Sequence, residues 1–310
     1  MTTFRYHVVS LLAVLLALAA GIALGGGPLS EVGRADGATD GGSSSRTAAL
    51  SDRLDAAGVA SGFQDRVATG FGARAVRGLL DGRAVAIVVM PGADDKVVGG
   101  LSTAVEDAGA TLTGQYTLTP RMLAPDGKSL VDTLGSQVAE SVKDVDVPAE
   151  ATTYDRMGQL IGRAVATTED AGDAPDGAAA DILSSLSGAK LMSAPDATSR
   201  RASLVLVVLG SEPDDATGAS NIYGGLVSGI DATSDGVVVT GSTASATGGL
   251  LRTLRGDATV TGTVSSVDSD QTAAGRLVAL LALDEARSGG RGQYGAEGAD
   301  GTLPSQRDNR

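Results

Sequence analysis

Acidic side chains follow three apolar, β-rich stretches of the chain, at places where carboxylates could bind a cation or a basic partner. If these stretches are parallel strands, their carboxyl ends meet at one edge, where ligands of open α/β sheets bind. A rim of carboxylates there would repel phosphate and favour a cation or an arginine-bearing partner. The alternative is helix capping, because a side-chain oxygen at a helix start accepts free N–H groups. These candidates, which are also the candidate metal ligands, are Asp94, Asp95, Glu212, Asp214, Asp215, Asp268 and Asp270.

The residues that common catalytic motifs require are missing from this sequence. The chain has no cysteine and its one histidine is His7, so no thiol nucleophile and no Ser-His-Asp triad can form in the main domain. The segment TGSTASATGG (240–249) has neither the Gly-Lys-Ser/Thr ending of a P-loop nor the Gly-x-Gly-x-x-Gly spacing of dinucleotide folds. We therefore expect a non-enzymatic protein with no evident cofactor.

The apolar stretches predict an α/β fold with a doubly wound, mostly parallel five-stranded sheet. Continuous β-rich runs are typical of strands buried on both faces, and helical stretches separate successive strands from the third onward. Between the second and third strands, three helical segments form an insertion at 120–201, which we expect to cover one edge of the sheet. The expected strands are Ala84–Met90, Thr111–Leu118, Ser203–Gly210, Gly236–Gly241 and Ala258–Val267.

The amino-terminal stretch has an uncharged apolar core, Val8–Leu24, which is long enough to cross a bilayer as a helix. Arg5 precedes it, so the positive-inside rule leaves the amino terminus in the cytoplasm and the rest outside. The alternative is a cleaved signal peptide, because Ala17-Leu18-Ala19 has the form of a cleavage site. Small residues at every fourth position would let another helix approach closely, although composition alone also produces such a pattern. They are Ala13, Ala17, Gly21 and Gly25.

The predicted organisation has five parts. A transmembrane anchor at 1–28 leads into a flexible linker rich in glycine and serine at 29–48, and then into a weakly amphipathic helix at 49–80. The α/β domain covers 81–296, and residues 297–310 form a disordered tail.

A glycine-rich segment, GGRGQYG (Gly289–Gly295), follows the expected last helix. Gly289 can end that helix in the left-handed conformation, and Gly290 then allows a tight turn. In one interpretation the turn folds back and plugs the edge of the sheet, with the ring of Tyr294 buried. In the other, the turn joins the acidic rim in a surface that binds a partner.

Two long motifs lie at the ends of the chain: FRYHVVSLLAVLLALAAGIALGGGPLS (4–30) and SSVDSDQTAAGRLVALLALDEARSGGRGQYG (265–295), in which Asp268 precedes Gly275-Arg276. Both resemble the mycobacterial copper transport protein B (MctB) family of actinobacterial envelope proteins, and the β–α order between them fits as well. The resemblance implies a single-pass envelope protein with a role in copper homeostasis or efflux, in a family often described as an outer-membrane channel. Related proteins are linked to a membrane complex that acts in cell separation.

Copper itself would find few ligands here. Copper(I) prefers cysteine or methionine sulfur and copper(II) favours imidazole, whereas this chain has one histidine and five methionines, no two of them close in sequence. Two hypotheses therefore remain open. The first is the copper role that the resemblance implies, and the second is a scaffold or regulator that binds another envelope protein, or itself through the membrane helix. Nucleic acid is excluded as a partner, because the net charge is −13 and no basic run occurs.

Overall fold

A computed structural model describes most of the 310-residue chain, and its described residues divide into two units between Ala75 and Val76. In the first unit, α2 (Gly42–Ala75) is a helix of 34 residues, where the sequence predicted a helix at 49–80. The predicted membrane span and its small residues lie outside the described residues. Within the described part of the chain, no helix is both long and apolar enough to cross a membrane. The described ranges are 42–142, 147–148, 150–195, 200–210 and 218–304.

The second unit contains a seven-stranded sheet in the order β3-β2-β1-β4-β5-β6-β7. Neighbouring strands are parallel, except that β3 runs antiparallel to β2 at one edge. The α/β class is confirmed, but the prediction of five strands is wrong, because β3 and β7 have two residues each and no sequence pattern marks them. The strands are β1 (Ala84–Val89), β2 (Thr111–Leu118), β3 (Met192–Ser193), β4 (Leu204–Val208), β5 (Gly236–Thr240), β6 (Ser265–Val267) and β7 (Gln293–Tyr294).

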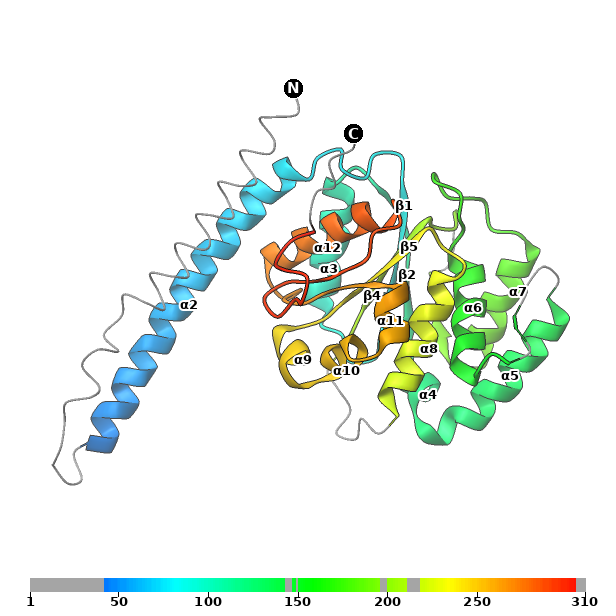
Figure 1. The fold of residues 1–310 in the computed structure, drawn as a ribbon, viewed down its shortest axis with the longest axis horizontal. Helices are drawn as coiled ribbons and strands as arrows, with labels where there is room; N and C mark the ends of the chain where they lie inside the picture. The colour runs from blue at the N-terminus through cyan, green and yellow to red at the C-terminus, as the bar shows by residue number, and fades with distance from the viewer. Residues whose placement is uncertain (1–41, 143–146, 149, 196–199, 211–217, 305–310) are drawn as a thin grey trace. The chain divides into compact units, whose positions relative to one another are not determined.

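Helices cover both faces of this sheet (Figure 1). The central strands are apolar throughout because alternate side chains enter two different cores: Val85 and Ile87 face α3 and α12, while Ala86 and Val88 face the opposite layer. The first face carries α3 (Asp95–Asp107) and α12 (Ala273–Ala286). The opposite layer contains α5 (Lys128–Ser141), α6 (Thr153–Val165), α7 (Gly177–Gly188), α8 (Ala219–Asp231), α10 (Leu250–Arg255) and α11 (Ala258–Thr263).

The fifth predicted strand is wrong in its first half. Residues 258–263 form α11, and only Ser265–Val267 pairs with the sheet as β6. The β-branched residues of ATVTGT favour a strand locally, but the Asp257 side chain caps a helix by accepting a hydrogen bond from the Thr259 N–H at 2.9 Å. Val260 is buried on this short helix, so packing and capping together outweigh the local strand propensity.

The last β-α-β unit crosses the sheet with the opposite hand to the others. β1-α3-β2 and β6-α12-β7 place their helices on the same face but move toward opposite edges of the sheet. The connection β4-α8-β5 advances toward the same edge of the sheet as β6-α12-β7, but its helix packs on the opposite face. It therefore has the same handedness as β1-α3-β2. Parallel crossovers are right-handed in about 98% of cases. The left hand therefore belongs to β6-α12-β7, and something specific must hold β7 at its edge.

Within the helical layer, α6 and α8 approach each other closely along a seam of glycines. A β-carbon on Gly158 would lie 2.4 Å from the carbonyl oxygen of Leu226, and one on Gly229 would lie 2.5 Å from that of Asp155. Side chains at these positions would collide with backbone atoms, which cannot turn aside. This seam therefore fixes the distance between the insertion and the helix that follows β4.

Candidate functional site at the carboxyl edge of the sheet

The four acidic candidates that lie in the described residues do not form one metal-binding cluster. Asp94 is the N-cap of α3 and accepts a hydrogen bond from the Lys96 N–H at 2.8 Å, while Asp95 lies exposed in the first turn of that helix. Asp268 and Asp270 follow β6 and are 0% and 3% exposed. Within the described ranges, no group of three or more His, Asp or Glu side chains could hold a metal ion. The remaining candidates, Glu212, Asp214 and Asp215, lie outside the described residues.

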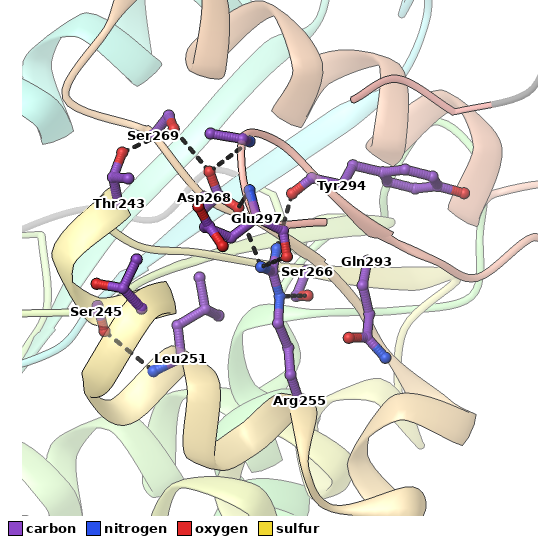
Figure 2. A network of polar contacts seen from close by, with 12 residues as sticks. Thr243, Ser245, Leu251, Arg255, Ser266, Asp268, Ser269, Gln293, Tyr294 and Glu297 are labelled. Atoms are coloured by element: carbon purple, nitrogen blue, oxygen red, sulfur yellow. Dashed lines mark hydrogen bonds and ion pairs between the residues drawn. The ribbon is translucent and has the colours of Figure 1, made fainter. Parts of the chain in front are cut away.

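The carboxylate of Asp268 is the centre of a buried polar network (Figure 2). Both of its oxygens are saturated with donors, two of which are backbone N–H groups of the segment after β7. Oδ1 accepts from Ser269 Oγ at 2.6 Å and from the Ala296 N–H at 2.8 Å, and Oδ2 accepts from the Glu297 N–H at 2.9 Å and Arg255 Nη1 at 3.0 Å. The carboxylate thus ties the end of β6 to the carboxyl-terminal segment.

Arg255 completes this connection from the last residue of α10. Its Nε donates to Ser266 Oγ at 2.9 Å, and its Nη2 donates to the carbonyl of Tyr294 at 2.7 Å, so one guanidinium holds both β6 and β7. The Arg255 side chain is only 8% exposed, and its ion pair with Asp268 is correspondingly shielded from water. Removing either partner would leave an uncompensated buried charge, which costs far more than a surface ion pair contributes.

The electrostatics show which protonation state the network needs. Burial alone would raise the pKa of Asp268, but the hydrogen bonds from Ser269, from the backbone of Glu297 and Ala296, and from Arg255 together hold that pKa below its ordinary value. Asp268 is therefore ionised at neutral pH. Because each of its oxygens already accepts two hydrogen bonds, the carboxylate acts as a structural anchor.

The glycines of GGRGQYG are required by close contacts or backbone conformation. Gly289 has φ +77° beyond the end of α12, and Gly295 has φ +119° beside the Asp268 carboxylate. A β-carbon on Gly292 would lie 2.2 Å from the Tyr294 hydroxyl oxygen, and one on Gly290 would lie 2.3 Å from Cγ of Glu285. The turn can therefore fold back onto the sheet edge, where β7 pairs with β6.

Tyr294 anchors the same turn on the other side. Its ring points away from Asp268 (Figure 2), and the residue is 3% exposed. Its hydroxyl donates to Glu285 Oε2 on α12 at 2.5 Å. The tyrosine thus connects the edge strand to the helix that precedes it. The role of the turn in binding a partner stays a prediction.

Gly275 and Arg276 begin α12 against the loop that follows β6. A β-carbon on Gly275 would lie 2.0 Å from the carbonyl oxygen of Ser269, so only glycine allows the helix to start this close. Arg276 Nη1 donates to the carbonyl of Asp270 at 3.2 Å, and its side chain packs over Gly100 of α3. The motif therefore joins the β6 loop to both helices on this face of the sheet.

The loop between these anchors is strained. Ser269 has φ +67°, which is uncommon for a residue other than glycine, and its hydroxyl lies 2.9 Å from Thr243 Oγ1 at the start of α9 (Thr243–Gly248). The hydrogen bonds to Asp268 and Thr243 hold the serine in this conformation. Such strain persists only where the surroundings over-determine it.

At the crevice that usually binds ligands in this fold, the described ends of two loops lie against each other. Counting only the parallel strands, the order reverses between β1 and β4, and open α/β sheets bind their ligands at such a switch point. A β-carbon on Gly210, after β4, would lie 1.8 Å from the carbonyl oxygen of Pro91, after β1. The two loops are therefore in direct contact at that point.

Sequence reasoning missed several residues of the network. Arg255 and Ser266 belong to no motif, and Glu285 is one of many acidic residues on helices. It also overlooked a Ser-x-x-Lys spacing, Ser187 to Lys190, which catalytic serines of some hydrolases share. Both of these residues are exposed, and the Lys190 N–H donates to the Ser187 carbonyl at the end of α7, so the spacing belongs to a helix terminus.

The comparisons with known proteins agree with the motifs at the two ends of the chain. The family described as "Copper transport outer membrane protein, MctB" matches residues 1–304. This chain belongs to the MctB family. It is similar to the copper transporter MctB of Mycobacterium bovis (strain ATCC BAA-935 / AF2122/97) and to those of Mycobacterium tuberculosis strains CDC 1551 / Oshkosh and ATCC 25618 / H37Rv. Each is 28% identical over 95% of this chain and 96% of its own length.

In this MctB-family chain, the methionines of the described residues are core residues. All four lie in the core on the side of α6 and α8, and none is more than 2% exposed. Their sulfur atoms fill space among apolar side chains, a common role for methionine. His7 lies outside the described residues, and the chain has no cysteine. The four methionines are Met90, Met122, Met157 and Met192.

Proposed function

We propose that this MctB-family chain is a non-catalytic envelope protein that acts in copper homeostasis or efflux without holding copper in its α/β domain. The family match over residues 1–304 carries the copper role, because the relatives are named copper transporters. The chemistry of the domain supports the second part. Copper(I) needs accessible sulfur or imidazole, and the described methionines are enclosed in the core.

The placement we propose is a single amino-terminal membrane helix, uncleaved, with the domain outside the cytoplasm. The uncharged run Val8–Leu24 and the preceding Arg5 support it, and the envelope location in the family's description agrees with it. A reporter enzyme that is active only outside the cytoplasm, fused after Arg310, should be active. Recovery of soluble mature protein that begins near Ala20 would contradict the anchor.

A second candidate is a scaffold or regulator that binds another envelope protein, for example in cell separation. The observation that favours it is that Asp268, Arg255 and Tyr294 are fully engaged in holding the fold together. A scaffold of this kind would act through its partner, and any effect on copper would be indirect. It could contact the partner through its domain or its membrane helix.

Copper accumulation in living cells separates these functions. In the bacterium that carries this chain, deletion of the gene should raise cellular copper and slow growth in added copper, and the intact chain should restore both. A variant with leucine at Met90, Met122, Met157 and Met192 should restore them equally well, because leucine conserves core volume. If the leucine variant folds but fails, the domain handles copper through its methionines. If deletion leaves copper unchanged and disturbs cell separation, the scaffold function is favoured.

A further inference from the structure

Two buried carboxyl groups follow β6, and in the described part of the chain only one of them forms a salt bridge. Asp268 forms an ion pair with Arg255, but no salt bridge among the described residues involves Asp270. Asp270 is nevertheless 3% exposed. A buried carboxylate without a counter-charge is costly, and the usual response is that the group takes up a proton.

The surroundings of Asp270 offer little to an ionised carboxylate. Its hydrogen bonds come from the Thr240 hydroxyl on β5 and from the Gln271 N–H, and Thr240 shares its single proton with the Val207 carbonyl at 3.5 Å. Two charged groups act on it from the elements packed here: Arg276 on α12, whose Nη1 is bonded to backbone carbonyls, and Asp268 on β6. β7 contributes no charged residue. Burial therefore dominates and raises the pKa of Asp270 to about 6.

Asp270 lies two residues from the anchor of the carboxyl-terminal strap, which we define as residues 293–301. The strap is held by the Asp268 carboxylate through the N–H groups of Ala296 and Glu297, and the Asp268 N–H donates to the Tyr294 carbonyl at 3.1 Å. Asp270 and Asp268 both follow β6, so water that solvated an ionised Asp270 would enter next to the anchor of the strap. Its entry there would disturb the donors on which Asp268 depends.

We propose that Asp270 is a proton-operated lock on the strap: the neutral carboxyl keeps the end of β6 closed, and the ionised carboxylate loosens the strap from the sheet. The direction follows from linkage. A carboxyl group whose pKa is raised in the closed form stabilises that form fully below its ordinary value of 3.8, and this contribution is lost as pH rises through about 6. Above that point the loosening is complete, so the response lies between roughly pH 4 and pH 6.

Backbone hydrogen–deuterium exchange on the full chain in detergent micelles tests this lock. After correction for the intrinsic effect of pH on exchange, the strap should exchange roughly 20-fold faster at pH 7 than at pH 4.5, since these two pKa values set the ratio. In Asp270→Asn, which mimics the neutral carboxyl, the strap should exchange slowly at both pH values. Asp235→Asn is the matched control, because Asp235 is another carboxyl group with a raised pKa. It lies at the amino-terminal end of β5, whereas Asp270 follows the carboxyl-terminal end of β6.

The wild-type pH response persisting in Asp270→Asn would overturn the lock, as would its loss in Asp235→Asn. A second variant keeps the test open if Asp270→Asn does not fold. Thr240→Val removes a donor from the ionised carboxylate, so the pH at which strap exchange levels off should move upward. A purely structural role for Thr240 would change the exchange rate without moving that pH, and this result would also contradict the proposal.

Discussion

The carboxylate of Asp268 occupies the space that a side chain on Gly295 would need. A β-carbon on Gly295 would lie 2.5 Å from Cγ of Asp268 and within 2.7 Å of both carboxylate oxygens. Gly295 also has φ +119°, a conformation that residues with side chains rarely adopt. This single contact explains why the segment after β7 can approach the end of β6 closely enough to bond to it.

Gly295→Ala should therefore destabilise the domain through both the backbone and the contact. The conformation alone costs on the order of 1–3 kcal/mol for a residue with a side chain, and the displaced carboxylate adds to this. Gly289→Ala is the matched control, since Gly289 has φ +77° but open space around it. It should cost only roughly 1–2 kcal/mol. Urea unfolding followed by circular dichroism measures both, and equal losses would show that the contact with Asp268 does not matter.

Tyr294 offers a second test of how β7 is held. Tyr294→Phe removes only the hydrogen bond to Glu285 and should cost about 1–2 kcal/mol, because it leaves a partly buried carboxyl group without this donor. Tyr294→Ala also removes a ring that is 3% exposed, and should cost about 3 kcal/mol or more. Thermal unfolding of the two variants separates ring from hydroxyl. An alanine variant as stable as the wild type would show that β7 contributes nothing to the fold.

Arg255 should be the most sensitive position of the network. Arg255→Ala leaves Asp268 buried without its counter-charge, which costs about 3–5 kcal/mol. Arg255→Lys should recover only part of this, because an ammonium group cannot reach Ser266, Asp268 and the Tyr294 carbonyl together. Arg252→Ala is the control, because Arg252 lies one turn earlier on α10 and bonds only to the exposed Thr247 carbonyl.

The loss caused by Arg255→Ala should also depend on pH. The lowered pKa of Asp268 stabilises the wild-type domain above the ordinary value of 3.8, and this contribution is lost as pH falls through the lowered pKa. Without Arg255, the carboxyl group can escape its unpaired charge only by protonation. The difference in unfolding free energy between the variant and the wild type should therefore be smaller at pH 4 than at pH 7. A constant difference would contradict the role of the ion pair.

The strands that could be predicted from sequence are those of five or more residues, which are long enough to carry a β-rich pattern. β1, β4 and β5 are continuous apolar runs, and β2 was predicted with its observed bounds, Thr111–Leu118. Two-residue strands such as β3 and β7 exist only because a neighbouring strand offers hydrogen-bonding groups, so their sequences need carry no pattern. The same holds for the hand of β6-α12-β7, which depends on contacts made by the strap.

The site was predictable only in part, for a similar reason. Asp268, Tyr294 and the glycines of the turn stand out because their types are unusual for their positions, and the structure brings them together. Arg255 did not stand out, because an arginine at the end of a short helix normally faces solvent. Its role depends on where α10 lies relative to β6, and no local sequence pattern encodes that distance. Sequence reasoning identifies positions with unusual backbone conformations, such as the glycines of the turn, more readily than a long side chain such as Arg255 that contacts them from a distant element.

The glycine seam between α6 and α8 gives the last prediction. Gly158→Ala and Gly229→Ala each place a β-carbon within about 2.5 Å of a backbone carbonyl oxygen on the other helix, so the helices must separate. Overpacking of this kind typically costs 1–3 kcal/mol, and a rigid backbone neighbour places these variants at the upper end. Both should lower the unfolding free energy by about 3 kcal/mol, despite the higher helix propensity of alanine.

Gly99→Ala is the matched control for this seam. Gly99 lies within α3, is exposed and has no atom within 4 Å of the added β-carbon, so the substitution should stabilise the domain by up to about 1 kcal/mol through helix propensity alone. The decisive comparison is the sign of the change in urea midpoint: upward for Gly99→Ala and downward for the two seam variants. An upward shift in all three would mean that α6 and α8 can move apart freely, and that the insertion is not held in place by its contact with α8.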